Sequence, residues 1–218
     1  MPREGKRIKG TACERAEARE QLRAELLTAA RSIATESDGF DSITMRSIAD
    51  RVGYTVPIVY QYFAGKRALL LDLVEVGFTE LAHHLDRAQC PAIQEREGGL
   101  LPATAVAYWQ FAMADPHLYR LMHTLPEVPF GTADAPAPAR ACFEALRRAV
   151  AAGPAAGGPR LPEWAHDEDA AADLLWAHLH GLVGLVLDGR IKGGGERGRI
   201  LLADLTRLFS SPVAPTSG

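Results

Sequence analysis

Cysteine and aromatic residues are scarce in this chain of 218 residues. Its three cysteines, Cys13, Cys90 and Cys142, are widely spaced and form no CxxC pair. An odd number of scattered cysteines predicts a reducing compartment and argues against a disulfide framework or a zinc site. Aromatic residues make up 7% of the chain, whereas Ala and Leu are abundant, which favours helices over sheets.

A long uninterrupted hydrophobic run is also missing. Residues 1–25 are polar and charged, and the longest apolar run, LLWAHLHGLVGLVL, covers 14 residues at 174–187 and includes two histidines. A secretory signal needs a hydrophobic segment near the N-terminus, and a membrane-spanning helix needs about 20 apolar residues. The sequence therefore predicts a soluble, cytoplasmic protein with no membrane partner.

The usual sequence signatures of catalysis and metal binding do not occur. We find no Gly-rich phosphate loop after a strand and no nucleophile elbow. The pairs His83–His84 and His178–His180 lack the i, i+4 spacing that places two helical histidines on one metal. We therefore predict that the chain is not an enzyme and uses no cofactor and no metal.

Charge is distributed unevenly along the chain. Residues 1–67 contain 12 Lys and Arg against 9 Asp and Glu, a net charge of +3, whereas the remainder carries −6. This asymmetry suits an N-terminal part that meets an anion. The first ten residues, MPREGKRIKG, are basic and have no hydrophobic face, which predicts a disordered arm.

Hydrophobic spacing predicts an all-helical chain. The first helix should run from about Glu14 to the turn at Asp38-Gly39. Thr44 is a suitable N-cap for a second helix that Gly53 would end. Later helices are expected at 66–89, 99–114, 116–123, 138–152, 167–189 and 199–209, with a loop at 124–139, a linker at 153–164 and a break at 189–198.

The stretch GYTVPIVYQYF, residues 53–63, consists mostly of strand-favouring types. Proline is poorly tolerated within a strand, but the second helical position accepts it because an N–H there has no intrahelical partner. With Thr55 as N-cap, Pro57 falls at that position. We therefore predict a short helix, so that residues 44–63 form a helix-turn-helix.

The 45 residues from Leu26 to Leu70 resemble the DNA-binding domain of the TetR family of bacterial transcriptional regulators. The shared features are an alanine pair, a Thr ahead of Ile-Ala, a Gly at the turn, a Ser/Thr cap, and a Tyr–aromatic–Lys ending, here Ala29, Ala30, Thr44, Ile48, Ala49, Gly53, Thr55, Tyr60, Tyr62, Phe63 and Lys66. The chain departs from the family pattern at Tyr54, usually Val, and at Tyr62, often His.

The resemblance implies that this segment binds duplex DNA. Hydroxyl groups, an ammonium group and helix N-terminal N–H groups would grip phosphates, while other side chains would face base edges. Tyr60 and Tyr62 could instead be aromatics that only pack within the domain. The basic arm could also reach DNA, with a solvated tail as the alternative; its charged residues are Arg3, Lys6, Arg7 and Lys9. The predicted DNA-binding residues are Thr44, Arg46, Thr55, Val56, Pro57, Tyr60, Gln61, Tyr62 and Lys66.

The C-terminal half resembles a TetR subgroup with a Trp followed four residues later by His-Gly, here Trp176, His180 and Gly181. Apolar groups with a few polar tips are typical of small-molecule pockets, and plain hydrophobic core is the alternative interpretation. The predicted lining of an inducer pocket is Trp109, Met113, Tyr119, Met122, His123, Phe143, Trp176 and His180.

A strip of small residues on the helix at 167–189 would permit close helix crossing and indicates a dimer interface with the last helix. The predicted interface residues are Ala177, Gly181, Gly184, Leu201, Leu205 and Leu208.

Together these observations predict an all-α protein with a basic arm at 1–13, a helix-turn-helix domain at 14–66, a ligand-binding and dimerisation domain at 67–210 and a tail at 211–218. The expected function is a TetR-type repressor that binds a palindromic operator as a homodimer and is released by a small-molecule inducer. A helical-bundle enzyme or cofactor-binding protein that uses the C-terminal pocket is the alternative.

Overall fold

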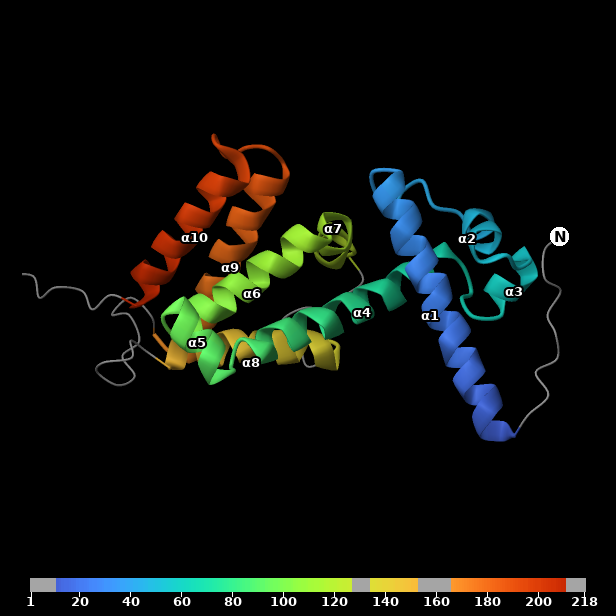
Figure 1. The fold of residues 1–218 in the computed structure, drawn as a ribbon, viewed down its shortest axis with the longest axis horizontal. Coiled ribbons are helices and arrows are strands. Elements are labelled where there is room, and N and C mark those ends of the chain that lie inside the picture. Colours follow the sequence, from blue (N-terminus) through green and yellow to red (C-terminus); the bar gives the residue numbers. More distant parts are fainter. Residues whose placement is uncertain (1–10, 127–133, 153–165, 211–218) are drawn as a thin grey trace, which may run out of the picture. The chain divides into compact units, whose positions relative to one another are not determined.

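The computed structural model describes residues 11–126, 134–152 and 166–210 (Figure 1). Within these ranges every regular element is a helix, which confirms the all-α prediction. The helices are α1 Ala12–Glu36, α2 Met45–Val52, α3 Val56–Tyr60, α4 Lys66–Arg87, α5 Pro91–Glu97, α6 Leu100–Ala114, α7 Pro116–Thr124, α8 Ala137–Ala151, α9 Glu168–Leu187 and α10 Gly194–Ser210. The predicted N-terminal arm up to residue 10, the whole linker at 153–164 and the tail lie outside the described residues.

One helix escaped the sequence analysis, which placed no element between Cys90 and residue 99. α5 begins with Pro91, whose fixed φ suits a first helical position, and Gly98 ends it in the left-handed conformation at φ 86°. The proline that stops α4 thus also starts α5. A proline after a helix can be followed by a loop or by a new helix, and the tertiary packing of the chain decides between the two.

The last helix begins five residues earlier than predicted. Gly194 and Gly195 open α10, and Gly198 lies in its second turn. A Cβ built on Gly198 would lie 2.4 Å from the Trp109 ring and 2.8 Å from Val186. Glycine disfavours helices by about 1 kcal/mol, but here the missing side chain makes room for a neighbouring ring, so the prediction of a break up to residue 198 is wrong.

The described residues divide into two compact units. The first contains the described residues up to Gly77 together with residues 117–126, which include all of α7 but its first residue, and the second contains the other described residues from Phe78 onward. The division falls inside α4, eleven residues beyond the domain boundary that the sequence suggests at 66/67.

In the first unit, α2 packs against both α1 and α3. Leu26, Ala30, Ile48 and Val59 are almost completely buried in its core, and each large apolar side chain contributes roughly 1.5–3 kcal/mol by leaving water. These contacts hold the short helix α3, which is too brief to be stable alone.

Two ion pairs attach α2 and α4 to α1. Arg51 on α2 donates to both carboxylate oxygens of Glu36, at 2.9 and 2.6 Å, and to Ser32 Oγ at 2.9 Å. The Arg51 guanidinium lowers the pKa of the exposed Glu36 carboxyl. Arg23 on α1 binds Asp72 on α4; burial raises the pKa of Asp72 and the nearby Arg23 charge opposes that rise.

The second unit is built around α6, which contacts α5, α8, α9 and α10. Nine of its 15 residues are buried, as expected of a helix with neighbours on most sides. On α8, burial raises the pKa of the Cys142 thiol to about 12, so this thiol stays protonated at neutral pH.

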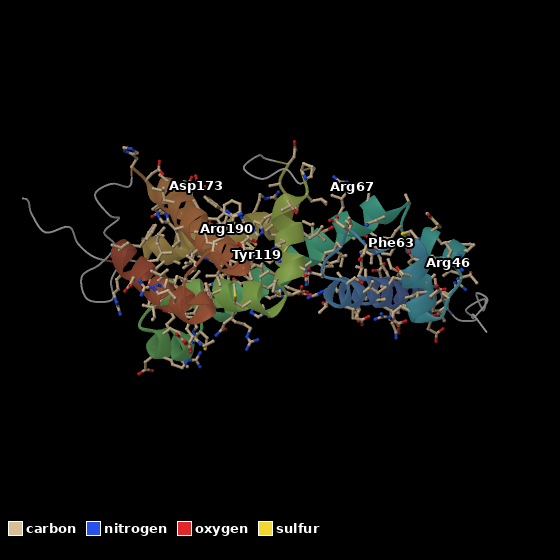
Figure 2. The ribbon with its side chains drawn as sticks, turned by 90° about the horizontal axis from the view of Figure 1, so that it is seen from above. Arg46, Phe63, Arg67, Tyr119, Asp173 and Arg190 are labelled. Atoms are coloured by element: carbon tan, nitrogen blue, oxygen red, sulfur yellow. The ribbon has the colours of Figure 1, made fainter. Side chains whose placement is uncertain are left out.

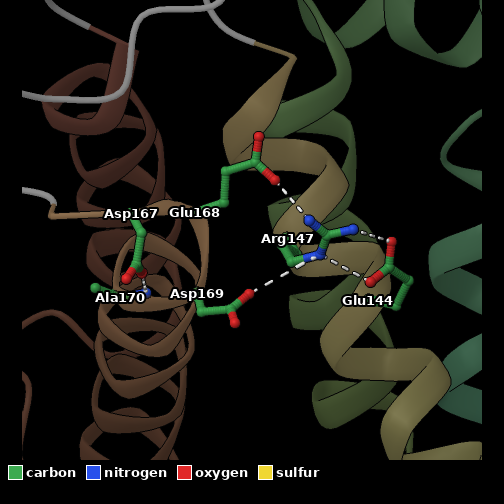
Figure 3. A network of polar contacts seen from close by, with 6 residues as sticks. All are labelled: Glu144, Arg147, Asp167, Glu168, Asp169 and Ala170. Atoms are coloured by element: carbon green, nitrogen blue, oxygen red, sulfur yellow. Dashed lines mark hydrogen bonds and ion pairs between the residues drawn. The ribbon is translucent and has the colours of Figure 1, made fainter.

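An arginine-centred network joins α8 to the first turn of α9 (Figure 3). Arg147 donates to both oxygens of Glu144 at 2.9 Å and to Glu168 at 2.6 Å, with Asp169 4.0 Å away. The arginine lowers the pKa of Glu144. Asp167 caps α9 by accepting a backbone N–H at 2.7 Å, so acidic groups favourably occupy the positive end of the helix dipole.

Candidate nucleic-acid interface and C-terminal pocket

The turn between α2 and α3 has the predicted geometry. Thr44 and Ser47 form a capping box in which Ser47 N donates to Thr44 Oγ1 and Thr44 N to Ser47 Oγ, both at 3.0 Å. Gly53 ends α2 with φ 75°, a conformation that L side chains rarely adopt. Tyr54 N then donates to Ala49 O at 2.9 Å, which fixes the direction in which the chain enters α3.

Helix α3 contains the strand-favouring residues 56–60 and has Pro57 at its second position, as predicted. Thr55 is the N-cap residue, but its side chain accepts no capping hydrogen bond. The helix is therefore held by the burial of Val59 and by backbone bonds such as Ile58 N to Thr55 O at 3.0 Å. The Thr55 hydroxyl is left out of the helix cap.

The predicted DNA-contacting residues of α2 and α3 lie on the protein surface. Arg46 has an 84% exposed side chain (Figure 2), and Tyr60 is 52% exposed. Pro57 and Gln61 are exposed, whereas Thr55, Val56 and Tyr62 are partly buried. Guanidinium and amide groups can hydrogen-bond base edges, and apolar groups can contact thymine methyls.

Tyr62, the second residue after α3, is partly enclosed by its own unit. The Arg19 guanidinium carbon lies 5.7 Å from the centre of its ring. Burial raises the pKa of Tyr62, and the nearby Arg19 charge opposes that rise. The hydroxyl is consequently protonated at neutral pH, which is the form that donates a hydrogen bond to a phosphate.

Lys66, predicted to contact phosphate, already binds its own chain. Its Nζ donates to the carbonyl oxygen of Asp41 at 2.6 Å and so ties the start of α4 to the loop before α2. An ammonium group has three donors, and one internal bond does not occupy them all.

A pocket of about 620 Å³ lies between α6 and α10 and extends to the end of α5. Its walls combine apolar side chains with a few polar and charged ones, the pattern expected of a small-molecule site. The lining residues are Glu97, Pro102, Val106, Trp109, Gln110, Met113, Ala114, Arg199, Leu202, Ala203, Thr206 and Arg207.

Of the predicted ligand-binding set, Trp109 and Met113 line this pocket. The sequence analysis missed the residues that α10 supplies, because it assigned that helix to the dimer interface alone. Their spacing carried a signal: residues 199, 202, 203, 206 and 207 follow the i, i+3, i+4, i+7, i+8 pattern of one helix face.

The other predicted ligand residues lie elsewhere. Tyr119, Met122 and His123 are on α7, in the first unit. There the ring centres of Tyr119 and His123 lie 4.5 Å apart. Met122 packs closely against Gly77: a Cβ added to that glycine would lie 2.6 Å from the Met122 sulfur. The remaining three, Phe143, Trp176 and His180, are partly buried on α8 and α9 and do not line the α6–α10 pocket.

Large apolar side chains are exposed along α9 and α10. They are Leu174 at 41%, Leu185 at 45%, Ile200 at 56% and Leu208 at 69%. The predicted small residues Ala177 and Gly181 are exposed on the same stretch of α9, and Gly184 and Leu201 are partly buried. Leu205, by contrast, is buried within its own unit at 7% exposure.

Two further features bear on the predicted absences. Within the parts of the chain that the structure describes, no group of three His, Cys, Asp or Glu side chains is placed to hold a metal ion. The α9 helix is long and apolar enough, by length and composition alone, to cross a membrane, but in this structure it packs against α6, α8 and α10.

Comparison with known families places both halves of the chain. A family described as bacterial regulatory proteins of the tetR family matches residues 26–73, and the tetracyclin repressor-like C-terminal domain matches residues 101–208. The HTH-type transcriptional activator FasR of Mycolicibacterium smegmatis is 30% identical over 104 residues. That match spans 48% of this chain and 46% of the activator, about half the length of each.

Solved structures extend the likeness to nearly the whole chain. A protein of unknown function from Rhodococcus sp. RHA1 is 28% identical with a TM-score of 0.65, covering 87% of this chain and 95% of that one. A TetR transcriptional regulator from the same organism has a TM-score of 0.55 over 90% of this chain and 100% of its own. Its identity of 18% shows a shared fold alone.

Proposed function

Because the chain belongs to the TetR family of bacterial transcriptional regulators, we propose that it binds a palindromic operator as a homodimer and leaves it when a small molecule binds. Members of this family are DNA-binding transcription factors and not enzymes, which removes the enzymatic alternative. The observation that carries the proposal is the α2–turn–α3 unit, whose buried face is fixed by Ile48 and Val59 and whose outer surface presents Arg46, Tyr60 and Gln61.

Each part of this surface has a distinct role in the proposal. Arg46, Thr55, Val56, Pro57 and Gln61 face base edges. The hydroxyl and ammonium groups, together with helix N-terminal N–H groups, bind phosphates and fix the register. The residues assigned to phosphates are Thr44, Tyr60, Tyr62 and Lys66.

The exposed apolar side chains of α9 and α10 support a homodimer. Leu185 and Leu208 would be buried in the interface, away from water. Ala177 and Gly181 would allow two α9 helices to approach closely. Two-fold symmetry then sets the DNA half-sites about one helical turn, roughly 34 Å, apart. This dimer interface would account for the apolar surface of α9 without a membrane. Because members of the family are soluble DNA-binding proteins, we place the protein in the cytoplasm.

The α6–α10 pocket is the proposed effector site. Trp109, Met113 and Leu202 provide an apolar wall, while Gln110 and Thr206 can fix a ligand by hydrogen bonds. A ligand that favours the state with low DNA affinity must, by linkage, be bound less tightly when DNA is present. A protein that leaves its operator when the effector binds acts as a repressor, and this is the role that we propose. We also propose that the chain belongs to the subgroup marked by Trp176, His180 and Gly181.

A mobility-shift assay on the DNA upstream of the protein's own gene tests DNA recognition. Tyr60→Ala should abolish the shift because the exposed side chain is lost, while circular dichroism stays helical. Tyr60→Phe removes only the hydroxyl and should weaken binding roughly tenfold, the usual effect of losing one charge-assisted hydrogen bond. A normal shift by Tyr60→Ala would contradict the proposed interface.

A further inference from the structure

The N-terminal half of α1 has no core to support. The helix starts with a full capping box, in which Thr11 N donates to Glu14 Oε2 at 2.6 Å. Its first buried residue is Leu26. The preceding residues, 12 to 22, form a helical extension of roughly 16 Å at 1.5 Å per residue, and Figure 1 shows it projecting past α2 and α3 of the same unit.

Charge on this extension is sorted by face. Arg15, Arg19 and Arg23 recur every four residues and therefore lie along one side of the helix. Glu14 and Glu17 fall away from that stripe. The stripe is in line with Leu22 and Leu26, so the basic side continues the face that packs on the unit, rather than the face turned away from it.

The innermost arginine fixes the position of the stripe. Arg23 binds Asp72 and places its guanidinium carbon 5.7 Å from the centre of the Phe63 ring. One turn further out, Arg19 lies at the same distance from the centre of the Tyr62 ring. The basic stripe is thereby held beside the two residues that follow Gln61 at the end of the recognition segment.

Arg19 retains its capacity to bind an anion in this arrangement. Its side chain is exposed, and contact with a ring face leaves the five N–H donors of the guanidinium plane available for an oxyanion. Glu20 is also within electrostatic reach of Tyr62, but its influence there is smaller than that of Arg19. Arg19 is therefore the charged group that acts most strongly on Tyr62.

We infer that Arg15 and Arg19 form a second phosphate-binding element, which grips the DNA backbone beyond the base pairs that α3 contacts. The inference rests on the proposed placement of Tyr62 at a phosphate. Arg19 binds the next phosphate along the strand, outside the base pairs under α3, and Arg15 binds one further out. The operator contact is consequently longer than the helix-turn-helix alone would make it.

The test measures DNA affinity as a function of salt. Wild-type protein first selects its own operator from random duplexes, and the dissociation constant is then followed by fluorescence anisotropy between about 0.05 and 0.2 M salt. Each lost phosphate contact should reduce the slope of log K against log salt by roughly 0.9. Because two protomers bind each operator, we expect a loss of about two contacts per complex for Arg19→Gln and about four for the Arg15→Gln/Arg19→Gln double variant.

A matched control is Glu17→Gln on the opposite face, which changes charge on the same helix and should leave the slope unchanged. On a duplex trimmed to the base pairs under α3, the double variant and the wild type should bind equally. An unchanged slope for Arg19→Gln overturns the inference, as does weaker binding without a slope change, because that result marks a packing role through Tyr62. Failure of the wild type to select any sequence refutes the proposed operator function instead.

Discussion

His180 is the residue whose environment most clearly predicts a pH effect. It lies partly buried on α9, and burial lowers the pKa of its imidazole below 6.5. Above pH 6.5 the imidazole is neutral in both the folded and unfolded states. Below that value the unfolded chain binds the proton first, so stability falls as the pH drops towards the lower pKa of the folded state.

His180→Gln should therefore reduce the loss of stability on acidification. Urea denaturation at about pH 7.5 and pH 5.5 would measure the free energy of unfolding of both proteins. We expect the difference in unfolding free energy between the two pH values to be smaller for the variant, because the buried imidazole that disfavours protonation is gone. The exposed His83→Gln variant controls for removal of one imidazole, and equal pH dependence of wild type and His180→Gln would contradict the prediction.

At the scale of helices, the close approach of α6 and α10 depends on Gly198. A Cβ at this position would lie 2.4 Å from the ring of Trp109 and 2.8 Å from Val186. Both neighbours belong to packed helices, and Trp109 also forms part of the wall of the α6–α10 pocket. Gly195 lies three residues earlier in α10, and a Cβ added there would have none of the neighbouring atoms considered for Gly198 within 4 Å.

The pair Gly198→Ala and Gly195→Ala separates packing from helix propensity. Alanine favours a helix by about 1 kcal/mol over glycine, so Gly195→Ala should raise the melting temperature slightly. Gly198→Ala should lower it, because overpacking costs roughly 1–3 kcal/mol. Thermal denaturation by circular dichroism measures both, and equal stabilisation by the two substitutions would show that α10 does not lie against Trp109 as described.

Helix α3 offers few side chains that can form hydrogen bonds with DNA bases. Its exposed groups include Pro57 and Tyr60, and Val56 is partly buried. In the proposed interface, the hydrogen-bonding groups toward bases come from Arg46, Thr55 and Gln61. Specificity should therefore depend partly on methyl contacts and on the shape of the operator DNA.

The whole molecule has an apolar surface that a single chain leaves in water. Leu174, Leu185, Ile200 and Leu208 are each between 41% and 69% exposed on α9 and α10. Scattered apolar side chains are normal on protein surfaces, but here they share two helices with Ala177 and Gly181. Burial against a second copy would remove this surface from water and place two recognition helices in one particle.

Leu185→Glu combined with Leu208→Glu should convert the protein from dimer to monomer. Each substitution would place a carboxylate in the apolar contact, where an unpaired charge is strongly disfavoured. Light scattering after size-exclusion chromatography should change from twice the chain mass to 23.5 kDa. Leu71→Glu, at an apolar position that is 37% exposed on α4, is the control and should leave the mass unchanged. A dimeric double variant would place the interface elsewhere.

The sequence by itself determined the elements whose signals are local. Thr44, Gly53 and Pro57 define helix ends through side-chain capping, a positive φ and a missing N–H, each of which acts within a few residues. The DNA-binding segment could be predicted from such signals, although its individual DNA contacts stay predictions. The all-α fold followed from composition and spacing for the same reason.

Tertiary structure alone decided the features that join distant residues. It made α5 and the first turn of α10 helical, placed Tyr119, Met122 and His123 with the N-terminal unit, and brought α10 against Trp109 to form the pocket. It also held Arg19 over the Tyr62 ring. These pairings depend on which helix faces pack together, and packing energy is shared among many residues far apart in sequence, so no local pattern specifies them.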